Sequence, residues 1–214
     1  MIDQQIDIPT KDGKTTTFIS HPERGGPFPV IIFYMDAPGI REELRDMARR
    51  LATSGYYVML PNMYYRAGAM ELGPINPDPE SPERKRMFEL MHSLNIPLVM
   101  EDTKALLAYA DGQAAANTKI VGAVGYCMSG QYAINAATHF PDRVKAAASM
   151  YGVALATDKP DSPHLAASKT KAEVEIYPGT HHGFAFPKRP IYHRDAAERH
   201  WERLLALYRR NLPA

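Results

Sequence analysis

Hydrophobic and polar positions follow two different periods along this chain. Continuous apolar runs at residues 29–34, 56–60 and 144–151 have the pattern of strands buried on both faces of a parallel sheet. Residues 40–54 and 96–110 instead place apolar side chains at helical spacing, with charged residues on the opposite face. Strands that alternate with helices predict an α/β fold with a mostly parallel sheet.

The two ends of the chain carry further patterns. Residues 5–9 and 15–20 alternate weakly around a Lys-Asp-Gly-Lys turn signal, which predicts an antiparallel hairpin. Residues 172–177 also alternate and predict a last strand. A final helix is predicted over 193–210, and its spacing buries Trp201, Leu204, Leu205 and Tyr208.

Two segments have the composition of loops. Residues 62–95 begin rich in glycine and proline and continue into a charged helical piece, which indicates an excursion over the active-site edge of the sheet. Residues 154–171 are predicted to form a second loop. The 214 residues suit one domain with a sizeable core, so we expect residues 1–214 to fold as a single unit.

Composition limits the partners of this protein. Lys and Arg number 25 against 24 Asp and Glu, so the net charge of +1 favours neither nucleic acid nor an acidic membrane surface. No run approaches the ~18 apolar residues of a membrane span. The single cysteine and the absence of a basic, apolar leader indicate a cytoplasmic protein. We expect a small-molecule substrate, and the sequence does not indicate an oligomeric state.

The only cysteine lies in the stretch with the clearest chemistry. Gly125-Tyr126-Cys127-Met128-Ser129-Gly130 follows an apolar run and precedes a helix-forming segment. A tight strand-to-helix turn needs small residues on both sides and lifts the apical side chain to the helix N-terminus. There the free N–H groups favour a thiolate and a nearby oxyanion. The alternative is an inert cysteine in the core.

A nucleophilic cysteine needs a base and oxyanion donors. His182 is the best base because it follows a predicted strand in a glycine-rich turn, and His181 is its close rival. The backbone N–H groups of Met128 and Ala37 are the expected donors. Asp36 could orient His182, hydrogen-bond the resting thiol, or cap the helix that follows it.

No cofactor or metal is expected. Two adjacent histidines in a turn are not a ligand spacing, and there is no second cysteine. The chain also lacks a glycine-rich phosphate loop.

Together these segments resemble the dienelactone hydrolase family, which has the α/β-hydrolase fold. The resemblance covers nearly the whole chain and rests on residues 34–40, 60–66, 125–130, 151–152 and 178–184, in that order. The family cleaves esters and lactones through an acyl-thioester on cysteine. The resemblance implies that Cys127 is the nucleophile and His182 the general base and acid, with Met128 and Ala37 forming the oxyanion hole.

Several positions depart from the family pattern. Its best-studied branch has Glu where this chain has Asp36, and it holds a substrate carboxylate with two arginines. One of these matches Arg66, whereas the other aligns with Phe186. Tyr65 lies in the excursion that is expected to line the pocket. Arg66, Tyr65 and Phe186 are therefore the candidate substrate-binding residues, and an apolar ester or lactone suits them at least as well as a dicarboxylate.

The distance along the chain from Cys127 to His182 is too short for the family fold. It is about 55 residues, whereas the family's full path from the nucleophile through the acid-bearing strand and helix to the histidine needs ~75 or more. Two strand patterns are spliced around Val174, and Glu173 and Glu175 lie on the predicted strand rather than beyond it. The sheet is therefore expected to lack one strand–helix unit. Either the chain lacks a segment of roughly 35–45 residues, or the natural protein is shorter and Asp36 or no residue completes the triad.

Two other functions compete with the hydrolase. A non-catalytic α/β-hydrolase-like binding protein would explain the missing acid and Phe186. A glutaminase-like amidotransferase would use Gln131 and a His-x-Glu pair, and His200-Trp201-Glu202 has those letters inside the predicted last helix.

Overall fold

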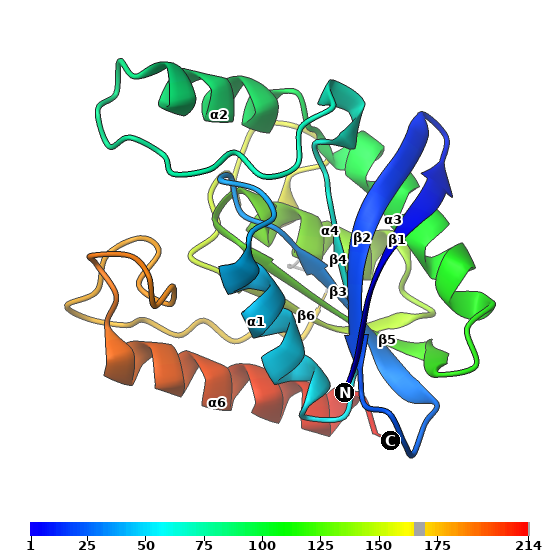
Figure 1. Ribbon diagram of the computed structural model, residues 1–214. Helices are drawn as coiled ribbons and strands as arrows, with labels where there is room; N and C mark the ends of the chain where they lie inside the picture. The colour runs from blue at the N-terminus through cyan, green and yellow to red at the C-terminus, as the bar shows by residue number, and fades with distance from the viewer. Residues whose placement is uncertain (165–169, 214) are drawn as a thin grey trace.

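A six-stranded sheet forms the centre of the protein (Figure 1). The structure, a computed structural model, describes residues 1–164 and 170–213. The strand order is β1-β2-β4-β3-β5-β6, with β1 and β2 antiparallel to their neighbours and the other four strands parallel. The strands are β1 Ile2–Thr10, β2 Gly13–His21, β3 Phe28–Tyr34, β4 Tyr57–Pro61, β5 Ala116–Tyr126 and β6 Val144–Met150.

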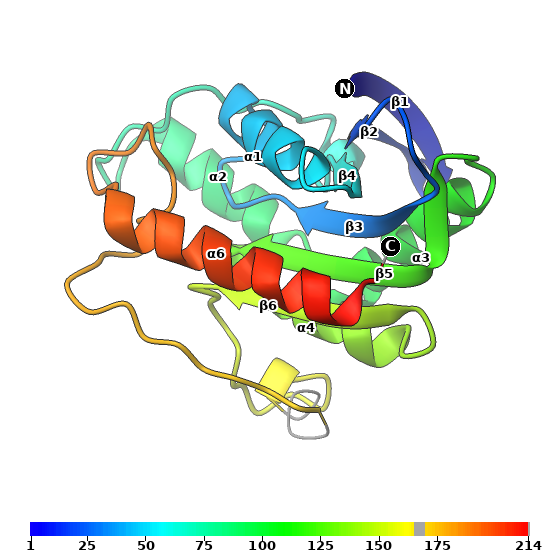
Figure 2. The same ribbon diagram turned by 90° about the horizontal axis from the view of Figure 1, so that it is seen from below.

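Helices cover both faces of this sheet. Helices α1 and α6 lie on one face, and α3 and α4 lie on the other (Figures 1 and 2). The helices are α1 Glu42–Ala52, α2 Pro82–His92, α3 Ile96–Asp111, α4 Gly130–His139 and α6 Arg194–Asn211, with short 3-10 turns η1 Tyr65–Ala67 and η2 Cys127–Ser129. This arrangement confirms the predicted α/β class with a mostly parallel sheet.

The central strands are apolar throughout because both of their faces are covered. Ile31 and Ile32 on β3 and Val58 on β4 have no exposed surface. Burying one such side chain stabilises the fold by about 1.5–3 kcal/mol. The continuous apolar runs in the sequence therefore report burial on both faces of the sheet.

Helix α6 packs closely over β5. The Tyr208 hydroxyl donates to the carbonyl oxygen of Ala123 at 2.8 Å. A Cβ atom on Gly122 would lie 2.9 Å from the Tyr208 ring and 2.8 Å from Leu212. Glycine at position 122 therefore allows the helix to approach the strand. Arg50 connects α6 to α1, because its guanidinium lies 4.7 Å from the centre of the Trp201 ring.

The N-terminal hairpin and the helix over 193–210 are confirmed, with only small shifts at their ends. The hairpin pairs Ile2 with His21 and Thr10 with Gly13, so its strands are longer than the alternation indicated. Trp201, Leu204 and Tyr208 are buried, whereas Leu205 is only half-buried.

The predicted strand at 172–177 is wrong. This segment is extended but pairs with no described strand, and Val174 and Ile176 are 93% and 77% exposed. Glu173 and Glu175 instead form ion pairs with arginines of α6. Alternation favours a strand only where a neighbouring strand supplies hydrogen bonds, and among the described residues the outer edge of β6 has no partner.

The second predicted loop, 154–171, includes residues 165–169, which lie outside the described residues. No helix in the described part of the chain has the length and apolar character needed to cross a membrane.

The segment 62–95 forms η1, an irregular stretch and α2. Ser81 caps α2 by accepting a hydrogen bond from the backbone N–H of Arg84 at 3.3 Å. A β-bridge between Gly39 and Glu71 joins the segment to the loop after β3. A Cβ atom on Gly39 would lie 2.8 Å from the carbonyl oxygen of Met70, so this approach requires glycine.

Two matched substitutions test whether 172–177 is outside the sheet. Because Ile176 is mostly exposed, Ile176→Ala should change the free energy of unfolding by less than about 0.5 kcal/mol. Ile32→Ala, at a fully buried position of β3, should cost about 2–5 kcal/mol. Urea unfolding of both variants measures the difference. A comparable loss for Ile176→Ala would mean that the segment is packed in solution.

Candidate active site

Cys127 lies at the apex of the turn between β5 and α4. Its φ of +57° is in the left-handed region, which is uncommon for a residue other than glycine. A Cβ atom on Gly125 would collide with the carbonyl oxygen of Ser129, and one on Gly130 would lie 2.7 Å from the Cα of Gly152. The glycines on either side of the turn are therefore required by the close passage of the backbone.

Hydrogen bonds hold the nucleophile turn to the two neighbouring strand ends. The buried Ser129 hydroxyl donates to the carbonyl oxygen of Met35, just after β3. The backbone N–H of Val153, after β6, donates to the carbonyl oxygen of Cys127 at 3.1 Å. Three loops at the carboxyl edge of the sheet are thus fixed to one another, where ligands of such sheets bind.

The two predicted oxyanion donors both face the Cys127 sulfur. The backbone N–H groups of Met128 and Ala37 act as hydrogen-bond donors to it, and each lowers the thiol pKa. Tyr64 supports this pair, because its hydroxyl donates to the carbonyl oxygen of Ala37 at 2.9 Å and lies 3.4 Å from the Met128 sulfur. The structure therefore brings Cys127, Met128 and Ala37 together.

The thiol of Cys127 is protonated at neutral pH. Burial raises its pKa above the ordinary value of 9.0, and the negative charge of Asp36 raises it further. The two backbone donors and the charge of Arg189 oppose this rise but do not overcome it. Attack by a thiolate would therefore require a base that removes the proton.

Asp36 is bound by two arginines. Its side chain is fully buried, and its oxygens accept hydrogen bonds from Arg41 at 2.6 and 3.1 Å and from Arg189 at 2.8 Å. It does not cap α1, because that helix begins after Arg41 without a side-chain cap. Arg41 also pairs with Glu43 at 2.9 Å. We call these four residues the Asp36 cluster.

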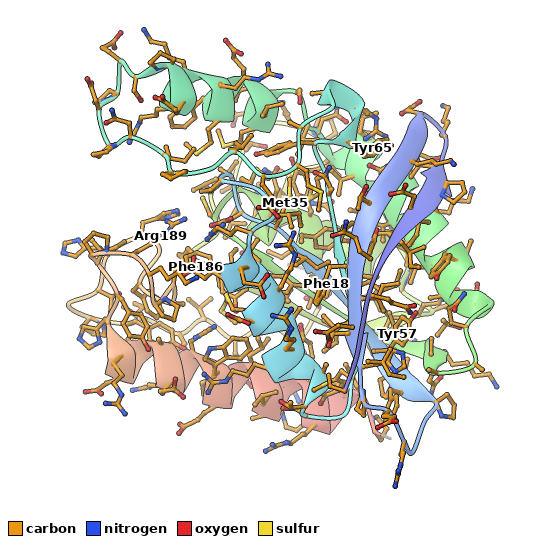
Figure 3. The ribbon with its side chains drawn as sticks, in the orientation of Figure 1. Phe18, Met35, Tyr57, Tyr65, Phe186 and Arg189 are labelled. Atoms are coloured by element: carbon orange, nitrogen blue, oxygen red, sulfur yellow. The ribbon has the colours of Figure 1, made fainter. Side chains whose placement is uncertain are left out.

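Phe186 is buried beneath the Asp36 cluster. The guanidinium carbons of Arg41 and Arg189 lie 4.9 and 4.5 Å from the centre of its ring (Figure 3). The side chain has no exposed surface. The backbone N–H of Lys188 adds a bond of 2.9 Å to Glu43. In this structure Phe186 anchors the loop that follows His182 and offers no surface to a substrate.

His182 lies on an exposed turn before this anchored loop. Its ring contacts the Tyr151 ring edge-to-face, with 5.1 Å between ring centres. Partial burial and the nearby charge of Arg189 lower its pKa below 6.5, although Asp36 opposes this shift. Among the described residues, no hydrogen bond joins His182 to the Cys127 thiol or to Asp36. The structure places the histidine at the edge of the site, against the Tyr151 ring and near the charge of Arg189.

Arg66 and Tyr65 make their contacts elsewhere. Arg66 binds both oxygens of Asp102 at 2.8 Å and one oxygen of Asp12 at 2.8 Å. The Tyr65 hydroxyl also donates to Asp102 and lies 2.8 Å from the hydroxyl of Thr10. These contacts hold both side chains against α3 and the β1–β2 turn (Figure 3). The positive charge of Arg66 is balanced by two carboxylates.

Tyr64 separates the oxyanion donors from a cavity of about 240 Å³. The cavity is lined by Met63, Tyr64, Arg66, Ala67, Ser93 and Leu94.

The sequence signals were weak for two residues of the site and absent for a third. Arg189 stands near the position of the family's second arginine but is not equivalent to it. Nothing predicted that Arg41 would fold back onto a carboxylate five residues earlier. Tyr151 was marked only as part of the resemblance, and its ring proves to lie against His182.

His200 is a core residue. It has no exposed surface, its Nε2 lies 2.8 Å from the Tyr126 hydroxyl, and its Nδ1 lies 2.6 Å from the carbonyl oxygen of Ala197. Burial lowers its pKa to about 4. A histidine enclosed in this way on α6 does not support the amidotransferase alternative.

Comparison with known proteins gives consistent matches. The model of the dienelactone hydrolase family matches residues 15–172 and 162–212. A protein of Methylorubrum extorquens named "Putative carboxymethylenebutenolidase" is 27% identical, with 98% of this chain and 81% of that protein covered. One of the same name from Escherichia coli is 24% identical, with 94% and 84% covered. A crystal structure described as "Putative Dienelactone Hydrolase" from Klebsiella pneumoniae has a TM-score of 0.80 at 22% identity, with 97% and 98% covered.

These matches also bear on the length of the chain. The alignment with the Methylorubrum protein runs over 244 positions, whereas this chain has 214 residues, so about 30 positions have no counterpart here. The family model matches in two stretches that meet at residues 162–172. The family match agrees in position with the predicted lack of one unit before the histidine loop, and the alignment length agrees with it in size only.

Asp36 and Arg189 carry opposite charges near the Cys127 thiol, so neutralising one or the other should shift the thiol pKa in opposite directions. Because Asp36 raises the pKa of Cys127, Asp36→Asn should move the pH dependence of iodoacetamide labelling to lower pH. Because Arg189 lowers the same pKa, Arg189→Gln should move it to higher pH. Asp12→Asn, which removes a carboxylate from Arg66, is the control and should leave the curve in place. Shifts of the same sign for the first two variants would contradict this account.

Proposed function

This chain belongs to the dienelactone hydrolase family, and from that premise we propose that it hydrolyses a small carboxylic ester or lactone through Cys127. The observation that carries the proposal is the position of the Cys127 sulfur. It lies at a left-handed turn, beneath two backbone N–H groups contributed by different loops. Such an arrangement suits covalent catalysis with an oxyanion hole.

In the proposed reaction, His182 takes the proton of the Cys127 thiol as the sulfur attacks the substrate carbonyl. The N–H groups of Met128 and Ala37 stabilise the resulting oxyanion. The tetrahedral species then collapses to an acyl-thioester, and His182 returns its proton to the departing oxygen. A water molecule, activated by the same histidine, releases the acid and restores the thiol.

The protonation states on both sides of this transfer support it. A thiol whose pKa is raised stays neutral at rest, and a histidine whose pKa is lowered is free to accept its proton. The missing hydrogen bond between them does not exclude the pair, because catalytic hydrogen bonds often form only with substrate bound.

Asp36 has a different task in this proposal from that of a triad acid. Its oxygens are held by Arg41 and Arg189, so it fixes the loop after His182 rather than the imidazole itself. In triads, loss of the acid lowers the rate without abolishing turnover. The names of the relatives support an enzyme rather than a non-catalytic binding protein.

The charges of the site favour a substrate without a carboxylate. Arg66 is committed to Asp12 and Asp102, and both arginines of the Asp36 cluster face carboxylates. We therefore propose an uncharged ester or lactone as the substrate. The single cysteine supports a reducing, cytoplasmic setting for such an enzyme.

Turnover of p-nitrophenyl acetate by single variants tests the proposal. Cys127→Ala removes the nucleophile and should lower kcat/KM by about 10⁴-fold, and Cys127→Ser should also be poor. His182→Ala should lower it by about 10²–10⁴-fold. His181→Ala is the matched control and should retain activity within a few-fold, because the ring that packs against Tyr151 is that of His182.

Circular dichroism and thermal unfolding should show that these variants are folded. Unchanged turnover in Cys127→Ala would refute the nucleophile, and loss in His181→Ala with retention in His182→Ala would reverse the assignment of the base.

The pH dependence of kcat/KM gives a separate test. His182 must be neutral to act as the base, and its folded-state pKa lies below 6.5. The acid limb of the profile should therefore have its midpoint below pH 6.5. Because Arg189 lowers this pKa, Arg189→Gln should move the midpoint upward. A wild-type midpoint above 6.5 would show that the free enzyme does not hold the histidine in this environment.

A further inference from the structure

Tyr151 occupies a central position in the site that the mechanism above does not use. It directly follows β6 and has a φ of +39°, a conformation that side chains rarely adopt. Its ring lies 5.1 Å from the His182 ring and 5.5 and 6.1 Å from those of Phe184 and Phe186. With the Tyr126 ring at 5.7 Å, four aromatic contacts and a strained backbone fix the direction of this side chain.

The Tyr151 hydroxyl is buried and bonds no described residue. An unpaired buried hydroxyl costs about 1–3 kcal/mol, so a group that binds it would recover that free energy. The charges of Tyr126, Asp36, Arg189 and Cys127 all influence the pKa of this hydroxyl. Burial raises the pKa of the hydroxyl far above 10.0, so it keeps its proton and can only donate or accept a hydrogen bond.

We propose that Tyr151 is a further catalytic residue, whose hydroxyl donates a hydrogen bond to the leaving-group oxygen of the ester. This inference rests on the proposed function. The carbonyl oxygen is directed to the N–H groups of Met128 and Ala37, whereas the leaving oxygen must face His182 to receive its proton. Because the Tyr151 ring packs against His182, its hydroxyl belongs to the leaving-group side.

The step balances without a new reactant. The carbon–sulfur bond to Cys127 is already formed, and the carbon–oxygen bond to the leaving group breaks with its electron pair on oxygen. His182 transfers its proton to that oxygen. Tyr151 transfers no proton, and its hydrogen bond stabilises the negative charge that develops before the proton arrives.

This role predicts that the defect of Tyr151→Phe depends on the leaving group. The negative charge on a more basic leaving-group oxygen is less stable by itself and depends more on a hydrogen bond. The loss in kcat/KM should therefore rise from p-nitrophenyl to phenyl to methyl acetate. The expected loss is less than about 3-fold for the first and on the order of 10- to 100-fold for the last, as for a hydrogen bond to a charged group.

Tyr57 provides the matched control. Its hydroxyl is also buried and bonds no described residue, but its ring stacks on His21 at 5.0 Å, far from the site (Figure 3). Tyr57→Phe should leave all three rates unchanged. Thermal unfolding of both variants separates effects on stability from effects on the reaction.

The outcomes distinguish this inference from the proposed function. An equal loss for all three esters, or no loss, would overturn the role of Tyr151 while Cys127→Ala remained inactive. Turnover in Cys127→Ala would overturn both. A loss that grows with leaving-group basicity in Tyr151→Phe and is absent in Tyr57→Phe supports the inference.

Discussion

The buried carboxylate of Asp36 and its two arginines hold the active-site region together. Asp36 follows β3, Arg41 precedes α1, and Arg189 belongs to the loop after His182. One carboxylate therefore joins the loop between β3 and α1 to Arg189, 153 residues away in the sequence, in the loop after His182. A buried charge is tolerated only with partners of good geometry, and removal of one partner typically costs 3–5 kcal/mol. The arginines in turn cover Phe186, so an ionic contact and an apolar contact secure the same loop.

The same cluster sets the electrostatic state of the catalytic pair. Asp36 raises the thiol pKa and Arg189 lowers it, whereas Arg189 lowers the histidine pKa and Asp36 raises it. Burial further favours the neutral forms of the Cys127 thiol and the His182 imidazole. Both Cys127 and His182 therefore favour their neutral forms rather than a preformed ion pair, and in the proposed mechanism the oxyanion would be stabilised by the backbone donors of Met128 and Ala37. Such a resting thiol is weakly reactive toward reagents that it meets by chance.

Local patterns predicted most of the fold, because the spacing of apolar residues in a buried parallel strand or an amphipathic helix reflects which faces of that element are buried. The nucleophile turn was also predicted, since its close backbone contacts require the glycines at positions 125 and 130, which the sequence displays. The failures involve long-range contacts. Residues 172–177 have a strand pattern but no neighbour to pair with, and Phe186 looked like a replaced ligand although it packs under two guanidiniums. The partners of Asp36 and Arg66 depend on how distant loops meet, which no spacing reveals.

The absent strand–helix unit explains why the histidine loop is held in this way. In a complete sheet, a strand beside β6 would carry the acid and a further strand would lead to the histidine. Here the segment before His182 pairs with no described strand, and it contacts α6 through the ion pairs of Glu173 and Glu175 and through the Tyr177 ring, which lies 5.9 Å from the Arg199 guanidinium. The position of His182 must then be determined from its C-terminal side, by Phe186 and Arg189, and by the ring of Tyr151. Aromatic packing restrains the plane of an imidazole but does not select its tautomer, which an acid would do. These contacts therefore place His182 without orienting it, and in the proposed mechanism a group that stabilises the leaving oxygen independently of the histidine, as the Tyr151 hydroxyl would, matters more than in a complete triad.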